Sequence, residues 1–322
     1  MTKRFQLPLT FLALFGSSLG AQEAARWPQF RGPGGRGIAA DDKPLPVHFG
    51  PDQNVVWKTP LPAGLSSPIV WGERIFVTGH DTQRQKLLTL CLDRRTGAIL
   101  WQQPAPVEKI EGVYKVNSSA TATPVTDGER VYVSFGSFGL LCYDFDGKEI
   151  WRRPLPLPPA GFGTATSPVL AGDLLLLNGQ GKDLHVLAVN PKTGADVWST
   201  AQPPFPSLYP APYLWKSGSA TEAIVPGRGG LLAYDVKDGS RRWWVPGLSP
   251  EANTSATEGG GLLFVASHLP GGDPDLRMQL PSFAELLKKH DKNGDGKLSR
   301  QEAPTDLKIF ARGGKEGVGE IH

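Results

Sequence analysis

Short apolar runs separated by turn residues fill most of the chain. One representative stretch starts at Pro68, runs through Ile69-Val70, turns at Trp71-Gly72-Glu73 and returns through Ile75-Phe76-Val77. Apolar runs this short, bounded by Gly, Pro or Asp, are typical of β-strands joined by hairpins and are too brief for helices. The pattern therefore predicts an all-β fold over most of the chain.

This unit recurs four times along the sequence. Each copy opens at a proline and ends in a strand that carries a tryptophan, and successive tryptophans are 50, 47 and 45 residues apart. Four short strands in a period of about 45 residues are typical of one propeller blade, which needs neighbouring blades to bury its faces. The openings are Pro68, Pro124, Pro168 and Pro212, and the tryptophans are Trp101, Trp151, Trp198 and Trp243.

A small residue, an Asp or Asn, and a Gly precede each of these tryptophans. Gly supplies the positive φ that closes a hairpin, and the Asp or Asn side chain accepts hydrogen bonds from its own downstream backbone. The Trp then buries a large flat side chain between blades. The four sets are Cys91, Asp93 and Gly97; Cys142, Asp144 and Gly147; Ala188, Asn190 and Gly194; and Ala233, Asp235 and Gly239.

These copies resemble the A-x-D-x-x-T-G-x-x-x-W motif of quinoprotein-type (PQQ-like) β-propellers. The resemblance covers roughly residues 26 to 267 and includes the segment from Trp27 to Pro33. Cys91 and Cys142 replace the small Ala, Asn190 replaces one Asp, and the second copy is one residue shorter. The resemblance implies a β-propeller of four-stranded antiparallel blades, and it implies more about fold than about activity.

The number of strands predicts an open arc. Residues 66–243 hold four complete blades, and a fifth begins at residues 253–256 and continues through Leu262–Val265 before the pattern stops. Residues 54–58 resemble a fourth strand that lacks the three strands before it, and the resemblance implies that such a strand closes the ring. We therefore expect a fragment of a longer propeller, with a predicted insertion in the fifth blade.

The organisation we expect has four parts: a signal peptide at residues 1–20, an N-terminal segment with the ring-closing strand at 21–65, propeller blades at 66–267, and a calcium-binding insertion with a truncated tail at 268–322. Lys3 and Arg4 precede an apolar stretch that ends near small residues around Ser18, which is typical of a cleaved signal. No Cys follows to carry a lipid. We expect a periplasmic or extracellular protein without a stable membrane anchor.

The sharpest local motif is an EF-hand loop at residues 291–302. Gly296 allows the sharp turn at the sixth position, and Ser282 and Glu285 form a capping box that starts the preceding helix. Pro304 must shorten or bend the helix that follows. The predicted calcium ligands are Asp291, Asn293, Asp295, the carbonyl of Lys297, Ser299 directly or through water, and Glu302.

Bound PQQ is not expected in this chain. Enzymes of the quinoprotein type carry two adjacent cysteines beneath the quinone and a channel calcium, whereas Cys91 and Cys142 lie far apart in sequence. We interpret both as small buried residues, with a disulfide between blades as the alternative. No catalytic residue is assigned, and the cofactor-binding residues stay unknown.

The leading hypothesis is an exported, non-catalytic binding or scaffold propeller with one calcium-binding EF-hand. The alternatives are a PQQ-dependent oxidoreductase and a secreted module that binds polysaccharide or matrix. A net charge of +3 without a dense Lys/Arg cluster argues against nucleic acid. The expected protein or polysaccharide partner would meet one propeller face. The polar residues of that face form either a ligand-binding rim or a solvated polar edge, and they are His80, Lys115, Asn117, Lys182 and Arg228.

Overall fold

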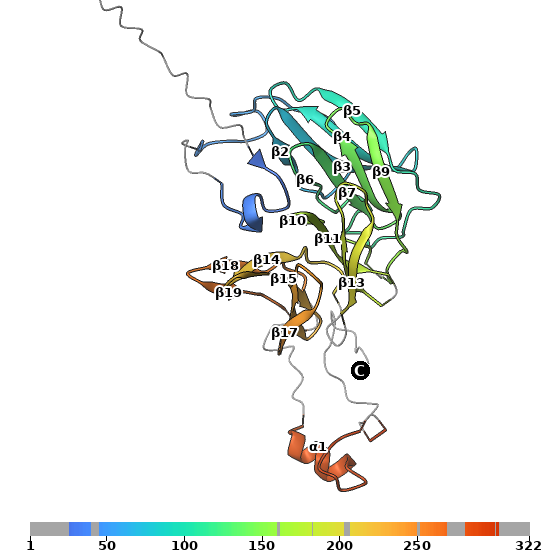
Figure 1. Cartoon of the computed structure of the whole chain (residues 1–322), viewed down its shortest axis with the longest axis vertical. Helices are drawn as coiled ribbons and strands as arrows, with labels where there is room; N and C mark the ends of the chain where they lie inside the picture. Colours follow the sequence, from blue (N-terminus) through green and yellow to red (C-terminus); the bar gives the residue numbers. More distant parts are fainter. Residues whose placement is uncertain are drawn as a thin grey trace, which may run out of the picture.

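The computed structural model describes residues 26–39, 45–159, 162–181, 183–202, 207–249, 252–268, 281–299 and 301–302. Within these ranges nearly all regular structure is antiparallel β-sheet (Figure 1), which confirms the all-β prediction. The exceptions are a 3₁₀ turn at Pro33–Gly35 and one helix, α1, at Phe283–His290. In the part that can be described, no helix is long and apolar enough to cross a membrane.

The strands form five sheets in chain order, and within each sheet consecutive strands pair antiparallel. All these pairs are hairpins except β1 with β2, which are joined by a long segment. The first sheet contains β1 Arg26–Trp27, β2 Ile69–Trp71, β3 Arg74–Asp81, β4 Lys86–Asp93 and β5 Ile99–Pro104; the second, β6 Val125–Thr126, β7 Arg130–Phe135, β8 Gly139–Asp144 and β9 Glu149–Pro154; the third, β10 Val169–Ala171, β11 Leu174–Gln180, β12 His185–Val189 and β13 Asp196–Ala201; the fourth, β14 Tyr213–Ser217, β15 Ala220–Gly227, β16 Gly230–Asp235 and β17 Arg241–Pro246; and the fifth, β18 Thr257–Gly259 and β19 Leu262–Phe264.

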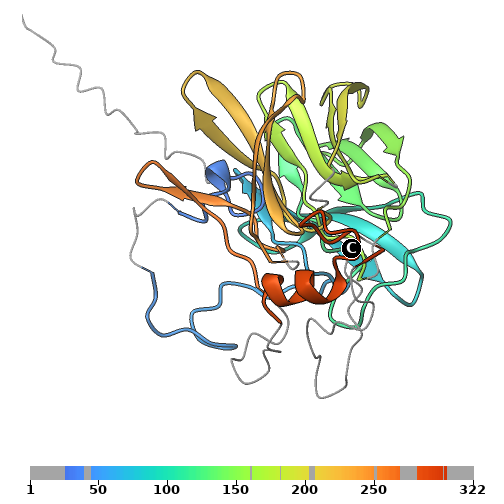
Figure 2. The same cartoon turned by 90° about the horizontal axis from the view of Figure 1, so that it is seen from below.

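Successive sheets stand beside one another in a propeller-like fan (Figure 2). Each hydrophobic cluster between them draws residues from two consecutive sheets. Phe76 and Leu87 pack with Val133 of the second sheet, and Leu176 of the third packs with Val225 of the fourth. The core is therefore a series of layers between sheets. The number of blades in a complete ring stays a prediction.

The small residue before each turn lies opposite the tryptophan of the next strand. Every one of these four pairs is followed at once by a register shift, so one β-bulge is repeated in four sheets. The bulge turns the strand sharply just before the Asp–Gly turn. The cross-strand pairs are Cys91 with Trp101, Cys142 with Trp151, Ala188 with Trp198, and Ala233 with Trp243.

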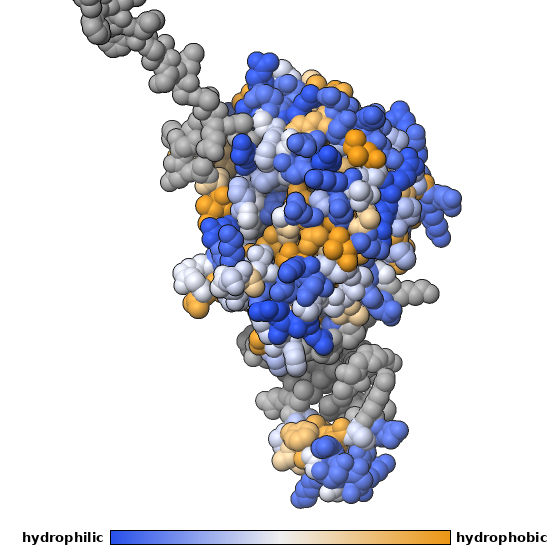
Figure 3. Space-filling view, viewed as in Figure 1, coloured by the Kyte–Doolittle hydropathy of each residue, from blue (hydrophilic) through white to orange (hydrophobic). Residues whose placement is uncertain are grey.

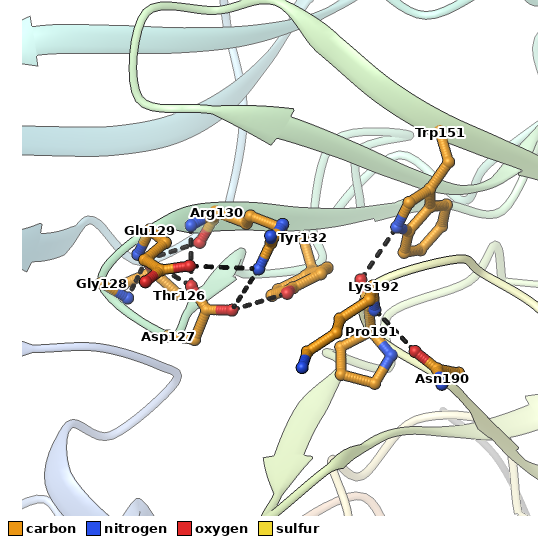
Figure 4. Close-up of polar contacts among 10 residues, drawn as sticks. All are labelled: Thr126, Asp127, Gly128, Glu129, Arg130, Tyr132, Trp151, Asn190, Pro191 and Lys192. Carbon is orange, nitrogen blue, oxygen red and sulfur yellow. Dashed lines mark hydrogen bonds and ion pairs between the residues drawn. The ribbon is translucent and has the colours of Figure 1, made fainter.

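Three of these tryptophans dock on the turn of the following sheet. Trp151 is buried and its Nε1 donates to the Pro191 carbonyl at 2.8 Å, as Figure 4 shows. Trp101 and Trp198 are half-buried and donate in the same way to the carbonyls of Phe145 (2.8 Å) and Val236 (2.9 Å). A ring in this position adds buried area and a satisfied donor at once.

A glycine under each ring makes this contact possible. A Cβ built on Gly147 or Gly194 would lie 2.7 Å from the Trp of the preceding sheet, and both glycines have positive φ. The Asp or Asn side chain shapes the same turn: Asp93 Oδ1 accepts from the backbone N–H of Arg95 and Thr96 at 3.0 and 2.8 Å. Any other residue in place of the glycine would separate the sheets.

The predicted strand at residues 54–58 is absent from the structure. No described strand lies alongside to supply ladder hydrogen bonds, and the nearest bridge pairs Gly50 with Gln53. Trp57 nevertheless docks on the first sheet as the other tryptophans dock on theirs: its ring lies over Gly97, and Nε1 donates to the Arg94 carbonyl at 2.9 Å. The indole contact is made without the strand.

Side-chain hydrogen bonds also stabilise the turn of the first hairpin in the second sheet. In the turn between β6 and β7, Asp127 Oδ1 accepts from the backbone N–H groups of Glu129 and Arg130, and Oδ2 accepts from the hydroxyl of Tyr132 at 2.7 Å (Figure 4). Burial, followed by the Asp127 contact, raises the pKa of Tyr132. The hydroxyl therefore stays protonated and donates to the carboxylate.

Cys91 and Cys142 are both buried and unbridged. Burial raises the pKa of Cys91 to about 11 and that of Cys142 to about 12. Both thiols stay protonated near neutral pH and act as small apolar residues opposite the indole rings.

Gly194→Ala tests the indole–glycine contact. Gly172 is the matched control, because it also has positive φ but nothing within 4 Å of its Cβ position. An Ala at positive φ costs roughly 1–2 kcal/mol, and overpacking against Trp151 adds about 2 kcal/mol. Urea denaturation should show G194A losing about 3 kcal/mol and G172A about 1 kcal/mol. Equal losses would contradict the packing role of the contact.

Candidate functional site

A cavity of about 750 Å³ lies where loops from consecutive sheets converge. Its wall comes from the segments just before the first strands of the sheets and from the N-terminal segment. It mixes apolar and aromatic side chains with hydroxyl and amide groups. The lining residues are Phe30, Arg31, Leu65, Val116, Asn117, Thr121, Thr123, Phe162, Ala165, Ser167, Tyr209, Pro210, Ala211, Asn253, Thr254, Ser255 and His268.

The N-terminal segment is held across several sheets, and this brings Phe30 and Arg31 to the cavity. β1 pairs with β2 of the first sheet, and the Pro28 carbonyl accepts from Thr126 N–H of the second sheet at 2.9 Å. Further along, Arg36 forms an ion pair with Glu258 of β18. These contacts place a guanidinium group, Arg31, in the cavity wall.

A repeated hydroxyl contact fixes the spacing of the first three sheets at the cavity. The backbone N–H of Ser67 donates to Thr123 Oγ1 at 3.0 Å, and that of Thr123 donates to Ser167 Oγ at 2.9 Å. Each is the residue before an opening proline. At the next equivalent position the chain has Ala211, which carries no hydroxyl.

Two loops meet at the rim of the cavity. Glu111 accepts hydrogen bonds from Thr164 N–H at 3.1 Å and from Thr164 Oγ1 at 2.7 Å. The Asn117 side chain donates to the Phe162 carbonyl at 2.8 Å, and the rings of Tyr114 and Phe162 meet edge to face at 5.3 Å. These contacts join the loop after the first sheet to the loop after the second.

The rim exposes large apolar side chains. Leu65 is 56% exposed, Tyr114 46%, Val116 74% and Phe162 41%. We call these four residues the apolar rim. Figure 3 shows that apolar patches also break the otherwise hydrophilic surface of the face seen in Figure 1. Exposed apolar groups that gather around a hollow are typical of binding surfaces.

A smaller cavity of about 290 Å³ adjoins the first and shares Phe162, Tyr209 and Asn253 with it. It extends towards Arg228, in the turn between β15 and β16. The described residues that line the two cavities include cationic Arg31 and Arg228 but no Asp, Glu or Cys. Such a lining can bind carbonyl, carboxylate or apolar groups, and it includes His268, a side chain of the type that most often acts as a general base.

The structure brings together only some of the predicted rim residues. Asn117 and Arg228 line the cavities, whereas Lys115 is exposed away from them and His80 is half-buried, with its backbone N–H bonded to Ala63. Lys182 lies outside the described residues.

Sequence reasoning missed Arg31, Glu111 and the Thr123–Ser167 pair. The repeated Ser or Thr before the opening prolines could have indicated the last of these.

In the loop at 291–299, the predicted ligands accept hydrogen bonds from the loop itself. The Asp291 carboxylate accepts from Gly294 and Gly296 N–H at 2.7 and 2.9 Å, and Glu302 Oε2 accepts from Ser299 Oγ at 2.6 Å. That bond and others from the backbone lower the pKa of Glu302, so it is ionised near neutral pH. Asn293 Oδ1 and Asp295 Oδ1 each accept from a backbone N–H two residues on, and Lys297 lies in the same turn.

The predicted ligands are not gathered around one point. Among the described residues, no three His, Cys, Asp or Glu side chains lie close enough together to hold a metal ion. Arg300, inside the loop, and Pro304, after it, lie outside the described residues. Residues 1–20, where the sequence predicts a signal peptide, and the tail from 303 also lie outside them. Calcium binding therefore stays a prediction from the sequence.

The main cavity does not fit a calcium-held quinone. The described lining supplies no carboxylate for calcium, and Cys91 and Cys142 are buried in two different sheets. The Asn117 and Asn253 amides and Arg31 are the polar groups of the lining best suited to bind a ligand.

The pH dependence of the free energy of unfolding should reflect the protonation of Glu111. Burial raises its pKa, although hydrogen bonds from Thr164 oppose the shift. The folded state then binds more protons here than the unfolded state, so the site contributes most stability below the ordinary Glu pKa and loses it as pH rises through the raised value.

We expect Glu111→Gln to flatten this dependence in urea denaturation series between about pH 4 and 7. Glu108→Gln, on the exposed part of the same loop, is the control and should keep the wild-type slope. A wild-type slope in E111Q would show that another group is responsible.

Comparisons with solved structures give matches of low identity. The structure of BamB from Moraxella catarrhalis aligns with a TM-score of 0.46 and 17% identity, over 66% of this chain and 57% of that one. A europium-containing methanol dehydrogenase aligns with a TM-score of 0.41 and 15% identity, over 59% and 42%. The quinohemoprotein alcohol dehydrogenase from Comamonas testosteroni aligns with 0.43 and 14%, over 63% and 39%. The chain thus spans about half the length of these structures.

No curated protein sequence matches the chain. A family match covers more than half of it: residues 84–263, from the first sheet to β19, match the family described as outer membrane protein assembly factor BamB. The matched range includes all four Trp-bearing strands described above. The chain therefore belongs to this family of PQQ-like repeat proteins.

Proposed function

We propose that this chain is an exported, non-catalytic binding protein that holds a segment of another protein against the apolar rim. The observation that carries the proposal is the rim itself: four large apolar side chains exposed around a cavity whose described lining has no acid or thiol. His268 and the hydroxyls of Thr123 and Ser167 also line the cavity, so the proposal rests on the exposed apolar area, which adhesion needs, and not on the composition of the lining.

The chemistry of the cavity supports a polypeptide partner. Asn117 and Asn253 offer amides that can bond a partner backbone, and Arg31 can bond a carbonyl or a carboxylate. Tyr114 and Phe162 supply rigid aromatic area, which is enriched at protein interfaces. The family description supports a partner within an outer-membrane assembly system.

A polysaccharide is the second candidate partner. Aromatic rings beside amide and hydroxyl groups, as at Tyr209, Asn253 and Thr254, also suit sugar rings. The proposed location is the periplasm or the extracellular space, based on the cleavable signal expected at residues 1–20. A PQQ-dependent oxidoreductase remains the alternative, and residues beyond those described would have to supply its calcium ligands.

We also propose that the loop at 291–302 binds one calcium ion. The support is local: α1 starts at a capping box of Ser282 and Glu285, and the two loop glycines, Gly294 and Gly296, have positive φ. Asp291, Asn293, Asp295, Lys297, Ser299 and Glu302 would be the ligands. Calcium would replace the hydrogen bonds that Glu302 accepts in this structure.

The partner proposal predicts site-specific crosslinking. A photo-crosslinking residue in place of Val116, introduced into the full chain in the cells that make it, should capture a discrete protein that mass spectrometry identifies as part of outer-membrane assembly. The same residue at Asp173 is the control, because the hairpin turn after β10 lies at the opposite end of the sheet. Equal capture at both positions, or none at Val116, would contradict the proposal.

Two further assays separate the alternatives. Glycan-array binding that is lost in Asn253→Ala would favour the polysaccharide partner over the protein partner. Alcohol-dependent dye reduction by the chain loaded with PQQ and calcium would overturn the non-catalytic assignment.

Calorimetry should show calcium binding with a dissociation constant of about 10⁻⁵–10⁻³ M, weaker than in cytosolic buffers. The affinity is low because three carboxylates of the loop are offset by Lys292, Lys297 and Arg300. Glu302→Gln should abolish the heat, whereas Glu285→Gln, in the capping box, should preserve it. No heat at millimolar calcium, or equal heat in both variants, would rule out the proposed site.

A further inference from the structure

Arg31, in the wall of the main cavity, has a backbone conformation that costs free energy. Its φ is +61°, in the left-handed region that residues with a side chain rarely adopt. The turn that holds it there is closed by the N–H of Gly37, which donates to the Arg31 carbonyl at 2.7 Å. A glycine would fit this position without strain. Strained residues gather at functional sites, so the arginine here points to a function of its side chain.

The same turn places the guanidinium group of Arg31. A Cβ built on Gly37 would lie 3.4 Å from Arg31 Nε and 3.5 Å from Nη2, so the guanidinium lies directly over this glycine. The Arg31 residue is half-buried and lines the cavity of about 750 Å³. Backbone and side chain together therefore hold one cationic group at a defined place in the cavity wall.

The charges around Arg31 are not balanced among the described residues. Arg36, in the same segment, donates from Nε to Glu258 Oε1 at 3.1 Å. Burial raises the pKa of Tyr213, and the hydrogen bond with Arg36 and the charge of Arg31 oppose the rise, so both guanidinium groups lie near this hydroxyl. Two cations thus share the carboxylate of Glu258. A half-buried cation is stabilised by a counter-charge, and a ligand carboxylate would supply it.

The described walls of the two joined cavities offer Arg31 no carboxylate. Their lining includes a second cation, Arg228, and no Asp or Glu. Glu111 lies at the rim, but both of its carboxylate oxygens accept hydrogen bonds from Thr164. The hollow is therefore complementary in charge to an acidic ligand.

We propose that Arg31 binds a side-chain carboxylate of the partner segment, so that the cavity selects acidic peptides. The inference rests on the proposed function, in which the partner is a polypeptide, and adds the charge that this partner carries. The planar guanidinium fork can bind a carboxylate through two parallel hydrogen bonds, whereas a neutral carbonyl would leave its charge unbalanced.

Acidic residues of the chain itself are the competing source of a carboxylate. Those that flank the Arg31 segment or the cavity residues in sequence, and lie outside the described residues, are Asp41, Asp42, Glu251, Asp273 and Asp275. A carboxylate of the same chain would need neither a strained position for the arginine nor a cavity beside its guanidinium. These two features favour a ligand.

Heptapeptides displayed on phage are the probe, selected against the full chain. The selected peptides should be enriched in Asp and Glu relative to the starting library. Arg31→Gly should weaken binding of the best synthetic peptide about tenfold in calorimetry, as expected for a lost hydrogen-bonded charge pair. Arg31→Lys keeps the charge but not the fork, and should weaken binding severalfold.

Gln85→Gly is the matched control. Gln85 also has positive φ, at +52°, but it is exposed in the turn between β3 and β4 and does not line the cavities. Both glycine variants relieve a left-handed residue, so neither should lower the midpoint of urea denaturation. Only R31G should lose peptide binding, and that loss then does not come from unfolding.

The outcomes separate this inference from the proposed function. Peptides selected without acidic enrichment, or bound equally by R31G, would overturn the role of Arg31 and leave a peptide-binding protein. If no peptide is selected, the inference fails, and capture at Val116 decides whether the proposed function fails with it. Changing the five undescribed acidic residues to amides gives a further test. Tighter peptide binding in that variant, seen only when Arg31 is present, would show that the chain's own carboxylate takes the site and would overturn the proposal.

Discussion

The contact of one indole ring with the glycine turn of the neighbouring sheet is the constraint on which the rest of the structure depends. It requires positive φ at the glycine, a small residue opposite the Trp across the strand, and a bulge that aims the turn. Cys91 and Cys142 meet the second requirement as well as Ala does, and their raised pKa values follow from the same burial. Because the ring also donates to a turn carbonyl, the contact fixes both the distance and the register between sheets.

The fixed spacing between sheets determines where the loops at the ends of the strands lie. The residues before the first strands converge, and the Ser67, Thr123 and Ser167 contacts repeat because the sheets repeat. The longer loops do not follow that repeat and form the rim, where the partly buried Glu111 accepts two hydrogen bonds from Thr164. Thr123 and Ser167 face the cavity and also join neighbouring sheets, whereas Val116 on the rim is 74% exposed and can change without affecting the packing between sheets. A chain of this family can therefore change its binding chemistry without losing its fold.

The sequence predicted those features that depend on local chemistry repeated along the chain. The strands, the Asp–Gly turns, the Trp positions and the capped helix α1 each follow from a few adjacent residues, and the structure contains them. Trp57 shows the limit of this local reasoning. Its neighbours have strand propensity, but a strand forms only where a neighbouring strand supplies backbone hydrogen bonds, and here only the indole contact forms. Arg31 and Glu111 were missed because their positions are set by segments distant in sequence, through β1 pairing with β2 and through the Thr164 contact. The loop at 291–302 is the reverse case: its described residues form local hydrogen bonds, yet no three of their acidic side chains lie close enough together to hold a metal ion.

In the fourth sheet, neither the contact of the indole with a turn glycine nor the hydrogen bond to a turn carbonyl is made among the described residues. Trp243 keeps the position of its equivalents and stays opposite Ala233, yet its N–H is satisfied within its own sheet by Glu222, a buried carboxylate that also lies 3.6 Å from Arg242. A buried donor must be satisfied somewhere, and here a carboxylate of the same sheet satisfies it. The position of the indole therefore follows from its own strand and from Ala233 opposite, while the acceptor of its N–H can change from a turn carbonyl to a side chain.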